Sequence, residues 1–160
     1  TRKESSAASD VYKRQREGEI VVQSPTLFNR YLGDEPRNNE QWFTTGDAGF
    51  FRDDQKLVVT GRLDDAIITG GEKVWPALIE RELESLKLFS EHIVVGRRDQ
   101  EWGQAVTIIG VPKNFETSID ISEIRAQLRE SLPNYALPKA IEIVEALPRN
   151  AMGKVLRRLI

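Results

Sequence analysis

The 160-residue sequence contains no cysteine, which excludes disulfides, thiol catalysis and cysteine-ligated metal sites. Its single histidine, His92, cannot build a site of several imidazoles, and the string EHIVVG around it indicates a structural residue at a strand edge. We therefore expect no metal site. No apolar run approaches the roughly 18 residues that span a bilayer, and no signal-peptide core is present. The formal net charge is only −2, so nothing calls for nucleic acid or an anionic membrane as a partner, and a cytoplasmic protein is expected.

What the sequence does contain is typical of a globular protein. Hydrophobic residues make up 39% and charged residues 30%, a balance that separates the chain from disordered sequences. The length suits one ordinary domain, or one small domain with a remnant of another. Residues 1–17 differ from the rest, because they are rich in Ser and Ala, then basic, without a hydrophobic period. We expect this segment to be disordered or foreign to the fold.

The string GRLDDAIITGGEKVWP, residues 61–76, mixes several kinds of chemistry in a short space. Arg62 is always charged, and its fixed fork of donors suits a hydroxyl or a phosphate. The two aspartates that follow favour a turn or a flexible joint, because their side chains compete with the backbone for hydrogen bonds. Gly70 and Gly71 allow positive φ or a close approach of the backbone to a ligand. Spacing alone favours a simpler interpretation, a strand, a hairpin turn and a helix start.

Short β-branched runs bounded by polar turns predict strands along the chain. They are expected at residues 20–22, 50–51, 57–59, 66–68, 92–95, 105–111 and 141–144. The strands at 66–68 and 105–111 are expected to be buried. The string TTGD at residues 44–47 follows two aromatic anchors and is expected to form the polar tip of a loop.

Two apolar stripes at helical spacing predict two helices. The first begins at Pro76, which suits the first helical position, and carries apolar residues at i, i+4 and i+7. The second begins at Asp120, which has capping-box spacing to Glu123, and its stripe runs to Leu132 before Pro133 stops it. The order strand, helix, strand, strand, helix, strand predicts an α+β fold, a short sheet packed by helices, preceded by a β-rich remnant.

Four strings, in this order, resemble signatures of the adenylate-forming superfamily of acyl- and aryl-CoA ligases, luciferases and peptide-synthetase adenylation domains. They are WFTTGD at 42–47, the string at 61–76, DQEWGQAV at 99–106 and LPRNAMGKVLRR at 147–158. The resemblance covers nearly everything from Gly18 onwards. It implies that residues 18–62 are the β-rich C-terminal edge of a large AMP-binding domain and that residues 63–160 are the mobile C-terminal domain. The rest of the large domain is then a missing partner.

For the nucleotide, the resemblance implies that Asp47 and Arg62 hold the ribose and the adenylate. It also implies Lys154 as the lysine used in adenylation and Asp64 as the hinge, a position that must absorb a large backbone change. Without the resemblance, Asp47 is also explained by an Asx turn. Lys154 is likewise explained by a solvated basic face shared with the two arginines that follow it.

For the thiol step, the resemblance implies that pantetheine passes the glycine turn at Gly70 and Gly71. It further implies Trp102 as a CoA-stacking aromatic and Lys139 as a contact to a CoA phosphate. The string YALPK at residues 135–139 departs from the Y-K-x-P-K of many relatives, so only its last lysine remains for that contact. Trp102 is explained as well by an ordinary core or rim aromatic.

The implied activity is acid–thiol ligation with ATP, Mg²⁺ held mainly by the missing domain, and CoA, acting on a small carboxylic acid. The strings look closest to o-succinylbenzoate- and 4-chlorobenzoate-type CoA ligases. The resemblance is also compatible with a homodimer of the full enzyme. The family's Gly/Ser/Thr-rich phosphate loop is absent from the 160 residues, so we expect no activity of the chain alone. Two alternatives stay open: a binding module that kept the fold without chemistry, and an adenylation domain that loads a carrier protein.

Overall fold

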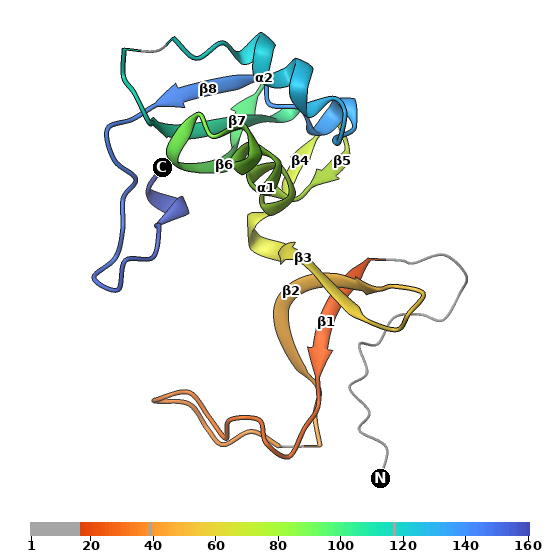
Figure 1. The fold of residues 1–160 in the computed structure, drawn as a ribbon. Coiled ribbons are helices and arrows are strands. Elements are labelled where there is room, and N and C mark those ends of the chain that lie inside the picture. Colours follow the sequence, from red (N-terminus) through yellow and green to blue (C-terminus); the bar gives the residue numbers. More distant parts are fainter. Residues whose placement is uncertain (1–16, 39, 117) are drawn as a thin grey trace. The chain divides into compact units, whose positions relative to one another are not determined.

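The computed structural model describes residues 17–38, 40–116 and 118–160, so the expected tail at 1–17 lies outside the described residues except for its last position. The chain divides into two compact units, one ending at Asp64 and the other spanning Asp65–Ile160. Each unit has a sheet of its own (Figure 1). The domain organisation implied by the resemblance stays a prediction.

The first unit is a three-stranded antiparallel sheet. Its strands are β1 (Gly18–Val22), β2 (Phe43–Phe51) and β3 (Leu57–Arg62), in the order β1-β2-β3. The predicted strands at 20–22, 50–51 and 57–59 are confirmed, and a hydrogen bond from the Arg52 N–H to the Lys56 carbonyl closes the turn between β2 and β3. The loop predicted at 44–47 is wrong. These residues lie inside β2, where Thr44 pairs with β1, Asp47 pairs with β3 and the two residues between them form a bulge.

The second unit is built on a five-stranded sheet. Its strands are β4 (Ile67–Thr69), β5 (Glu72–Val74), β6 (Phe89–Asp99), β7 (Gly103–Pro112) and β8 (Ala140–Ile143), ordered β5-β4-β7-β6, with β8 also paired to β7. β8 runs parallel to β7, and the other pairs are antiparallel. The buried strand predicted at 105–111 is confirmed within β7. The prediction for 66–68 is partly wrong, because Ile67 is buried while Ile68 is 46% exposed, as expected when successive side chains point to opposite faces.

Two helices, α1 (Pro76–Leu86) and α2 (Ile121–Leu128), complete the second unit. α1 begins at Pro76, as predicted, and buries its apolar stripe. Asp120 caps α2 by accepting a hydrogen bond from the Ser122 N–H at 2.8 Å. The predicted extension of this helix is wrong. α2 ends at Leu128, and Leu132 reaches the core from a turn, its N–H bonded to the Leu128 carbonyl at 2.9 Å.

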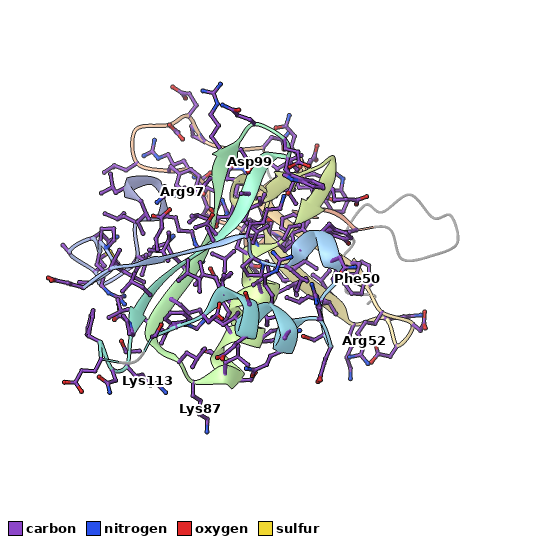
Figure 2. The ribbon with its side chains drawn as sticks, turned by 90° about the horizontal axis from the view of Figure 1, so that it is seen from above. Phe50, Arg52, Lys87, Arg97, Asp99 and Lys113 are labelled. Atoms are coloured by element: carbon purple, nitrogen blue, oxygen red, sulfur yellow. The ribbon has the colours of Figure 1, made fainter. Side chains whose placement is uncertain are left out.

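The two faces of the β6–β7 pair are covered differently. Val94 and Ile108 point to one face and form a core with the apolar residues of both helices. Ile93 and Ile109 point to the other face, where Leu147 and further apolar residues of the C-terminal segment pack. In this hairpin Asp99 lies at one end and Lys113, just beyond β7, at the other (Figure 2). The helices therefore cover one face, and the C-terminal segment, residues 144–160, covers the other.

Candidate functional site

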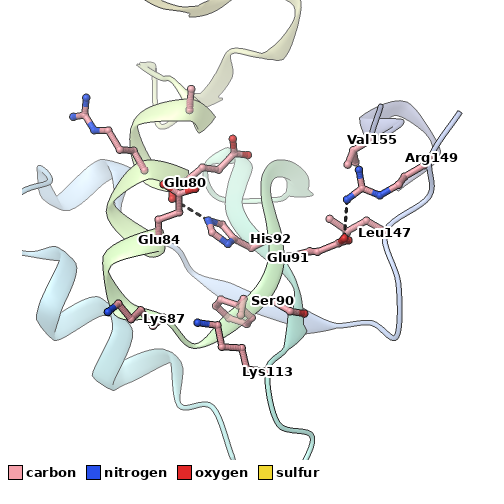
Figure 3. Close-up of a pocket in the computed structure, with 13 residues that line it drawn as sticks. Glu80, Glu84, Lys87, Ser90, Glu91, His92, Lys113, Leu147, Arg149 and Val155 are labelled. Carbon is pink, nitrogen blue, oxygen red and sulfur yellow. Dashed lines mark hydrogen bonds and ion pairs between the residues drawn. The ribbon is translucent and has the colours of Figure 1, made fainter. Parts of the chain in front are cut away.

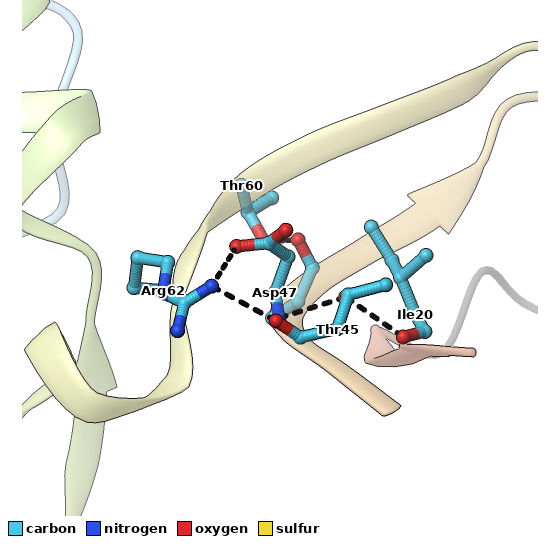
Figure 4. A network of polar contacts seen from close by, with 6 residues as sticks. Ile20, Thr45, Asp47, Thr60 and Arg62 are labelled. Atoms are coloured by element: carbon cyan, nitrogen blue, oxygen red, sulfur yellow. Dashed lines mark hydrogen bonds and ion pairs between the residues drawn. The ribbon is translucent and has the colours of Figure 1, made fainter. Parts of the chain in front are cut away.

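In the first unit, Asp47 and Arg62 occupy paired positions of β2 and β3. The Arg62 guanidinium donates through Nη1 to the Thr45 carbonyl at 2.9 Å and to Asp47 Oδ1 at 3.1 Å (Figure 4). Both side chains keep a large exposed fraction. A carboxylate retains lone pairs after accepting one such bond, so this pair can still accept from the hydroxyls of a ligand.

Asp47 lies in a bulge of β2. One residue of β1, Ile20, lies opposite three residues of β2, because the pairing shifts between Glu19↔Ala48 and Val21↔Thr44. Thr45 stabilises the bulge, since its hydroxyl donates to the Ile20 carbonyl at 2.8 Å and accepts from the Asp47 N–H at 3.0 Å. This role of Thr45 was not predicted from the sequence. The signal was the Thr-Thr-Gly-Asp string itself, in which a hydroxyl lies two residues before the carboxylate.

Glycine is required in this bulge. Gly46 has φ +72, and a Cβ there would lie 3.0 Å from Arg62 Nη2. The guanidinium therefore lies against the backbone of β2 in a place that a side chain would occupy.

The joint between the units follows β3 directly. A 3₁₀ turn, Leu63–Asp65, contains Asp64, which is exposed and is the last residue of the first unit. In the second unit, Asp65 Oδ2 lies 3.9 Å from Arg157 Nε.

The glycine turn joins β4 and β5 and packs against Trp102. Gly70 has φ +58 and Gly71 has φ +84, values that an L side chain rarely adopts. The Gly70 N–H donates to the Trp102 carbonyl at 2.8 Å, and a Cβ at Gly70 would lie 2.7 Å from Trp102 Cε3. Only glycine therefore fits between this turn and the indole.

Trp102 and Lys139 are in direct contact. The Lys139 ammonium lies 3.6 Å from the centroid of the indole ring, a cation–π arrangement. Its Nζ is buried, and within the described part of the chain it has no hydrogen-bond partner. Trp102 itself is 40% exposed, which places it at the rim of the second unit. The structure thus brings Gly70, Trp102 and Lys139 together, with the ammonium on the ring.

Lys154 lies on a different segment, in a loop closed by a bridge between Arg149 and Val155. The Asn150 Oδ1 accepts from the N–H of Met152 at 3.0 Å and from that of Lys154 at 2.9 Å. The Asn150 N–H donates in turn to the Lys154 carbonyl at 2.9 Å. Asn150 is a second residue that the sequence analysis missed, although an asparagine ahead of Gly153, which has φ +82, is typical of a side-chain-stabilised turn. The loop is therefore folded, with Lys154 exposed on it.

Arg157 does not belong to a solvated basic face, which corrects that interpretation for this residue. Its guanidinium forms a two-point ion pair with Glu80, Nη1 to Oε1 and Nη2 to Oε2, both at 2.8 Å. Burial lowers the pKa of Arg157, but the hydrogen bond and charge of Glu80, with the charge of Asp65, outweigh it and raise that pKa above its ordinary value. Arg157 is thus a fixed cation inside the second unit.

Both members of this pair also bind the backbone of β6. Glu80 Oε1 accepts from the Val94 N–H at 2.7 Å, and Arg157 Nη1 donates to the Val94 carbonyl at 3.0 Å. The neighbouring His92 ring bonds through Nε2 with the Glu80 carbonyl at 2.9 Å. The structural role expected for His92 agrees with this contact.

A pocket of about 610 Å³ lies between α1, the start of β6 and the C-terminal segment (Figure 3). Its lining carries both signs of charge, including the ion pair between Arg149 Nη2 and Glu91 Oε1 at 2.8 Å. None of the site residues expected from the sequence lines it. The residues with candidate chemistry therefore lie elsewhere.

The described residues offer neither a metal site nor a membrane-spanning helix. Across residues 17–38, 40–116 and 118–160, no group of three or more His, Asp or Glu residues is arranged to hold a metal ion. Over the same part of the chain, no helix is long and apolar enough to cross a membrane.

Comparison with known proteins gives these features a family. Residues 78–154 match the AMP-binding enzyme C-terminal domain. A 2-succinylbenzoate–CoA ligase from Bacillus licheniformis is 40% identical over 88% of this chain and 30% of its own length. A long-chain-fatty-acid–CoA ligase from Mycobacterium tuberculosis is 35% identical over 94% of this chain and also 30% of its own length. The chain thus spans about 30% of the length of the curated relatives it matches.

The solved structures agree. The o-succinylbenzoate CoA synthetase of Bacillus subtilis, determined with its acyl-adenylate intermediate, matches 96% of this chain and 32% of its own with a TM-score of 0.81 and 31% identity. The α+β fold predicted from the sequence is therefore confirmed. The chain therefore carries an AMP-binding enzyme C-terminal domain, and the relatives it resembles are CoA ligases.

Proposed function

We propose that this chain is the C-terminal part of an ATP-dependent acid–CoA ligase. In the first half-reaction, a carboxylate oxygen of the acid attacks the α-phosphorus of ATP and pyrophosphate leaves. In the second, the CoA thiol attacks the acyl carbon of the adenylate, the thiol proton is lost and AMP leaves. Negative charge gathers on phosphoryl oxygens in the first transition state, where a well-placed cation lowers the barrier.

The observation that carries this proposal is the folded loop of Lys154. Its ammonium is exposed at a position held by Asn150, inside the segment that matches the AMP-binding C-terminal domain. A long flexible lysine on a structured loop can enter a site formed by another domain and withdraw from it. We therefore propose Lys154 as the cation of the adenylation step.

The proposed nucleotide contacts are Asp47 and Arg62. Their chemistry fits a nucleotide, because a carboxylate accepts from two vicinal ribose hydroxyls and a guanidinium donates to oxygens of the adenylate. Asp64, exposed at the end of the first unit, is proposed as the hinge between the half-reactions. Mg²⁺ would be held by residues outside this chain, and none of these roles depends on it.

The proposed CoA contacts are the glycine turn and Trp102. Gly70 and Gly71 leave backbone without side chains where a pantetheine chain would pass. Lys139 supports this surface from the indole face, and contact with a phosphate would require its ammonium to leave the ring.

We further propose an aryl acid of the o-succinylbenzoate type as the substrate. This rests on the 2-succinylbenzoate–CoA ligase relatives, although a relative named a long-chain-fatty-acid–CoA ligase is also similar, over 94% of the chain. We expect the residues that enclose the acid in a domain that this chain does not contain. We accordingly propose that the 160 residues alone are inactive.

The test uses the complete ligase that carries this chain. Lys154→Ala is expected to lower acid-dependent ATP–pyrophosphate exchange by roughly 10²-fold, because a transition-state cation is lost. Thioester formation from supplied acyl-adenylate should change less than about threefold, because the first barrier is bypassed. Lys113→Ala, at an exposed lysine beyond β7, is the matched control and should leave both steps intact. Equal losses in both half-reactions would contradict the role.

A further inference from the structure

The segment that carries Lys154 has little regular structure. Between residues 144 and 160 it contains one isolated bridge, Arg149↔Val155, and one 3₁₀ turn, Arg157–Leu159. A lysine on such a segment is positioned only if the residues on both sides of it are attached to the rest of the unit.

The side that precedes Lys154 is attached by packing and by one ion pair. Leu147 is buried against the face of the sheet opposite the helices. Arg149 donates through Nη2 to Glu91 and through Nη1 to the Gly153 carbonyl, at 2.8 and 2.6 Å. This attachment is partly solvated, because the side chains of Arg149 and Glu91 are both substantially exposed.

Two arginines attach the side that follows Lys154. Arg97 Nη1 donates to the Ile160 carbonyl at the far end of the segment, and the Arg157 guanidinium, three residues after the lysine, binds groups of the second unit. Three groups from α1 and β6 converge there: both Glu80 oxygens and the Val94 carbonyl. A two-point guanidinium–carboxylate contact fixes orientation as well as distance. The pair is also less solvated than that of Arg149.

We propose that Glu80 and Arg157 are positioning residues for Lys154, which tie its loop rigidly to α1 and β6. The inference rests on the proposed function of Lys154 in adenylation. Rotation of a C-terminal domain about a hinge delivers a lysine to a reaction centre only if the loop follows the domain as one body. Without the Glu80–Arg157 ion pair, the same rotation would move the domain but would not fix the position of Lys154 relative to it.

The same guanidinium also lies next to the joint. Arg157 Nε is 3.9 Å from Asp65, the residue that follows the proposed hinge Asp64. The first residue of the second unit and the Lys154 loop are therefore connected through a single side chain. A change of backbone angle at Asp64 would therefore act on the segment that carries Lys154 through the Asp65–Arg157 contact, and not only through the sheet.

The first experiment uses the 160-residue chain and does not depend on activity. Amide hydrogen exchange, followed by NMR, compares wild type with Glu80→Gln, Arg157→Lys and Glu82→Gln. In Glu80→Gln, the amides of Lys154 and Leu156 should exchange at least about tenfold faster, while those of β7 stay unchanged. Arg157→Lys keeps the charge but loses the fork, so its effect should be intermediate. Glu82→Gln removes an ion pair with Arg81 on the same helix that does not involve the C-terminal segment, and is the control.

The second experiment measures the half-reactions of the complete ligase. Glu80→Gln should lower adenylate formation roughly 10- to 100-fold, because the lysine is misplaced, and change thioester formation from supplied acyl-adenylate less than about threefold. Arg157→Lys should recover part of the adenylation rate. A purely structural role would lower both half-reactions together and would not follow the exchange of the Lys154 amide.

The outcomes separate the two hypotheses. Unchanged exchange at Lys154 and Leu156 in Glu80→Gln would overturn the positioning role, whatever the activity. Faster exchange with unchanged adenylation would overturn it too, because the lysine would not need the tie. If Lys154→Ala itself retained adenylation, the proposed function of the lysine would fail, while the measured effect on exchange would stand.

Discussion

Two arginine–carboxylate pairs, one in each unit, are alike in chemistry and different in surroundings. Asp47 and Arg62 share one hydrogen bond, and their side chains are 36% and 50% exposed. Glu80 and Arg157 share two, their side chains are 18% and 28% exposed, and both also bind the backbone of Val94. The first pair keeps donors and acceptors available to a ligand, whereas the second has used them within the protein. Exposure and the number of protein partners distinguish them, and residue type does not.

The largest expected difference between the two pairs is in their contribution to the free energy of unfolding. Glu80→Ala is expected to lower the free energy of unfolding of the second unit by about 3 kcal/mol, because Arg157 and the Val94 N–H lose their partner in a poorly solvated place. Asp47→Ala should cost the first unit less than about 1 kcal/mol, because its pair is solvated. Urea unfolding followed by circular dichroism measures both. Similar losses for the two variants would remove the distinction.

Nucleotide binding should show the reverse order. In the complete ligase, Asp47→Asn is expected to raise the KM for ATP about tenfold with kcat nearly unchanged, because a charged acceptor for ribose is lost. Steady-state kinetics with varied ATP measures this effect. Asp54→Asn is the control, since Asp54 is a carboxylate in the β2–β3 turn that contacts Arg52 and Lys56. An ATP effect of equal size in both variants would point to general surface charge.

The smallest expected effect concerns a third pair, Arg97 and Glu142, which joins β6 and β8. The hydrogen bond from Arg97 lowers the pKa of Glu142 below its ordinary value, burial opposes this, and the Arg97 charge adds to it. A carboxyl whose pKa is lower in the folded state stabilises the protein above its unfolded pKa, and this contribution is lost as the pH falls through the folded one. Because the pair is partly exposed, the effect should be about 0.5 kcal/mol.

Urea unfolding of the second unit at pH 6 and at several values below about 4.5 measures that loss. Glu142→Gln should remove this part of the pH dependence and leave the rest. An unchanged acid profile in the variant would show that the pair does not contribute.

The sequence predicted those elements whose cause is local. Pro76 and the apolar spacing that follows it define α1, and the long β-branched run defines β7. The TTGD string was misplaced in a loop, because a bulge stabilised by the Thr45 hydroxyl is not visible in strand propensity. The end of α2 was misplaced because Leu132 has helical spacing but packs from a turn.

The candidate site shows the same limit. Asp47, Arg62, Lys139 and Lys154 were singled out by strings, yet the strings carried no information on their partners. Arg157 lies 77 positions from Glu80, and the sequence alone offered for it only the alternative of a solvated basic face. Such contacts depend on how α1, β6 and the C-terminal segment pack, and a single sequence does not contain that packing.

The contacts to Val94 have a further consequence for association between molecules. β6 is the last strand in the order β5-β4-β7-β6, and the unpaired backbone of an edge strand is a template for strands of other chains. At Val94 both backbone groups are already bound, the N–H by Glu80 and the carbonyl by Arg157. The side chains of Glu80 and Arg157 thus occupy the backbone groups of Val94, in the middle of the β6 edge, that another strand would need. A chain that lost this ion pair would offer an open strand to its neighbours, so the pair also protects against edge-to-edge aggregation.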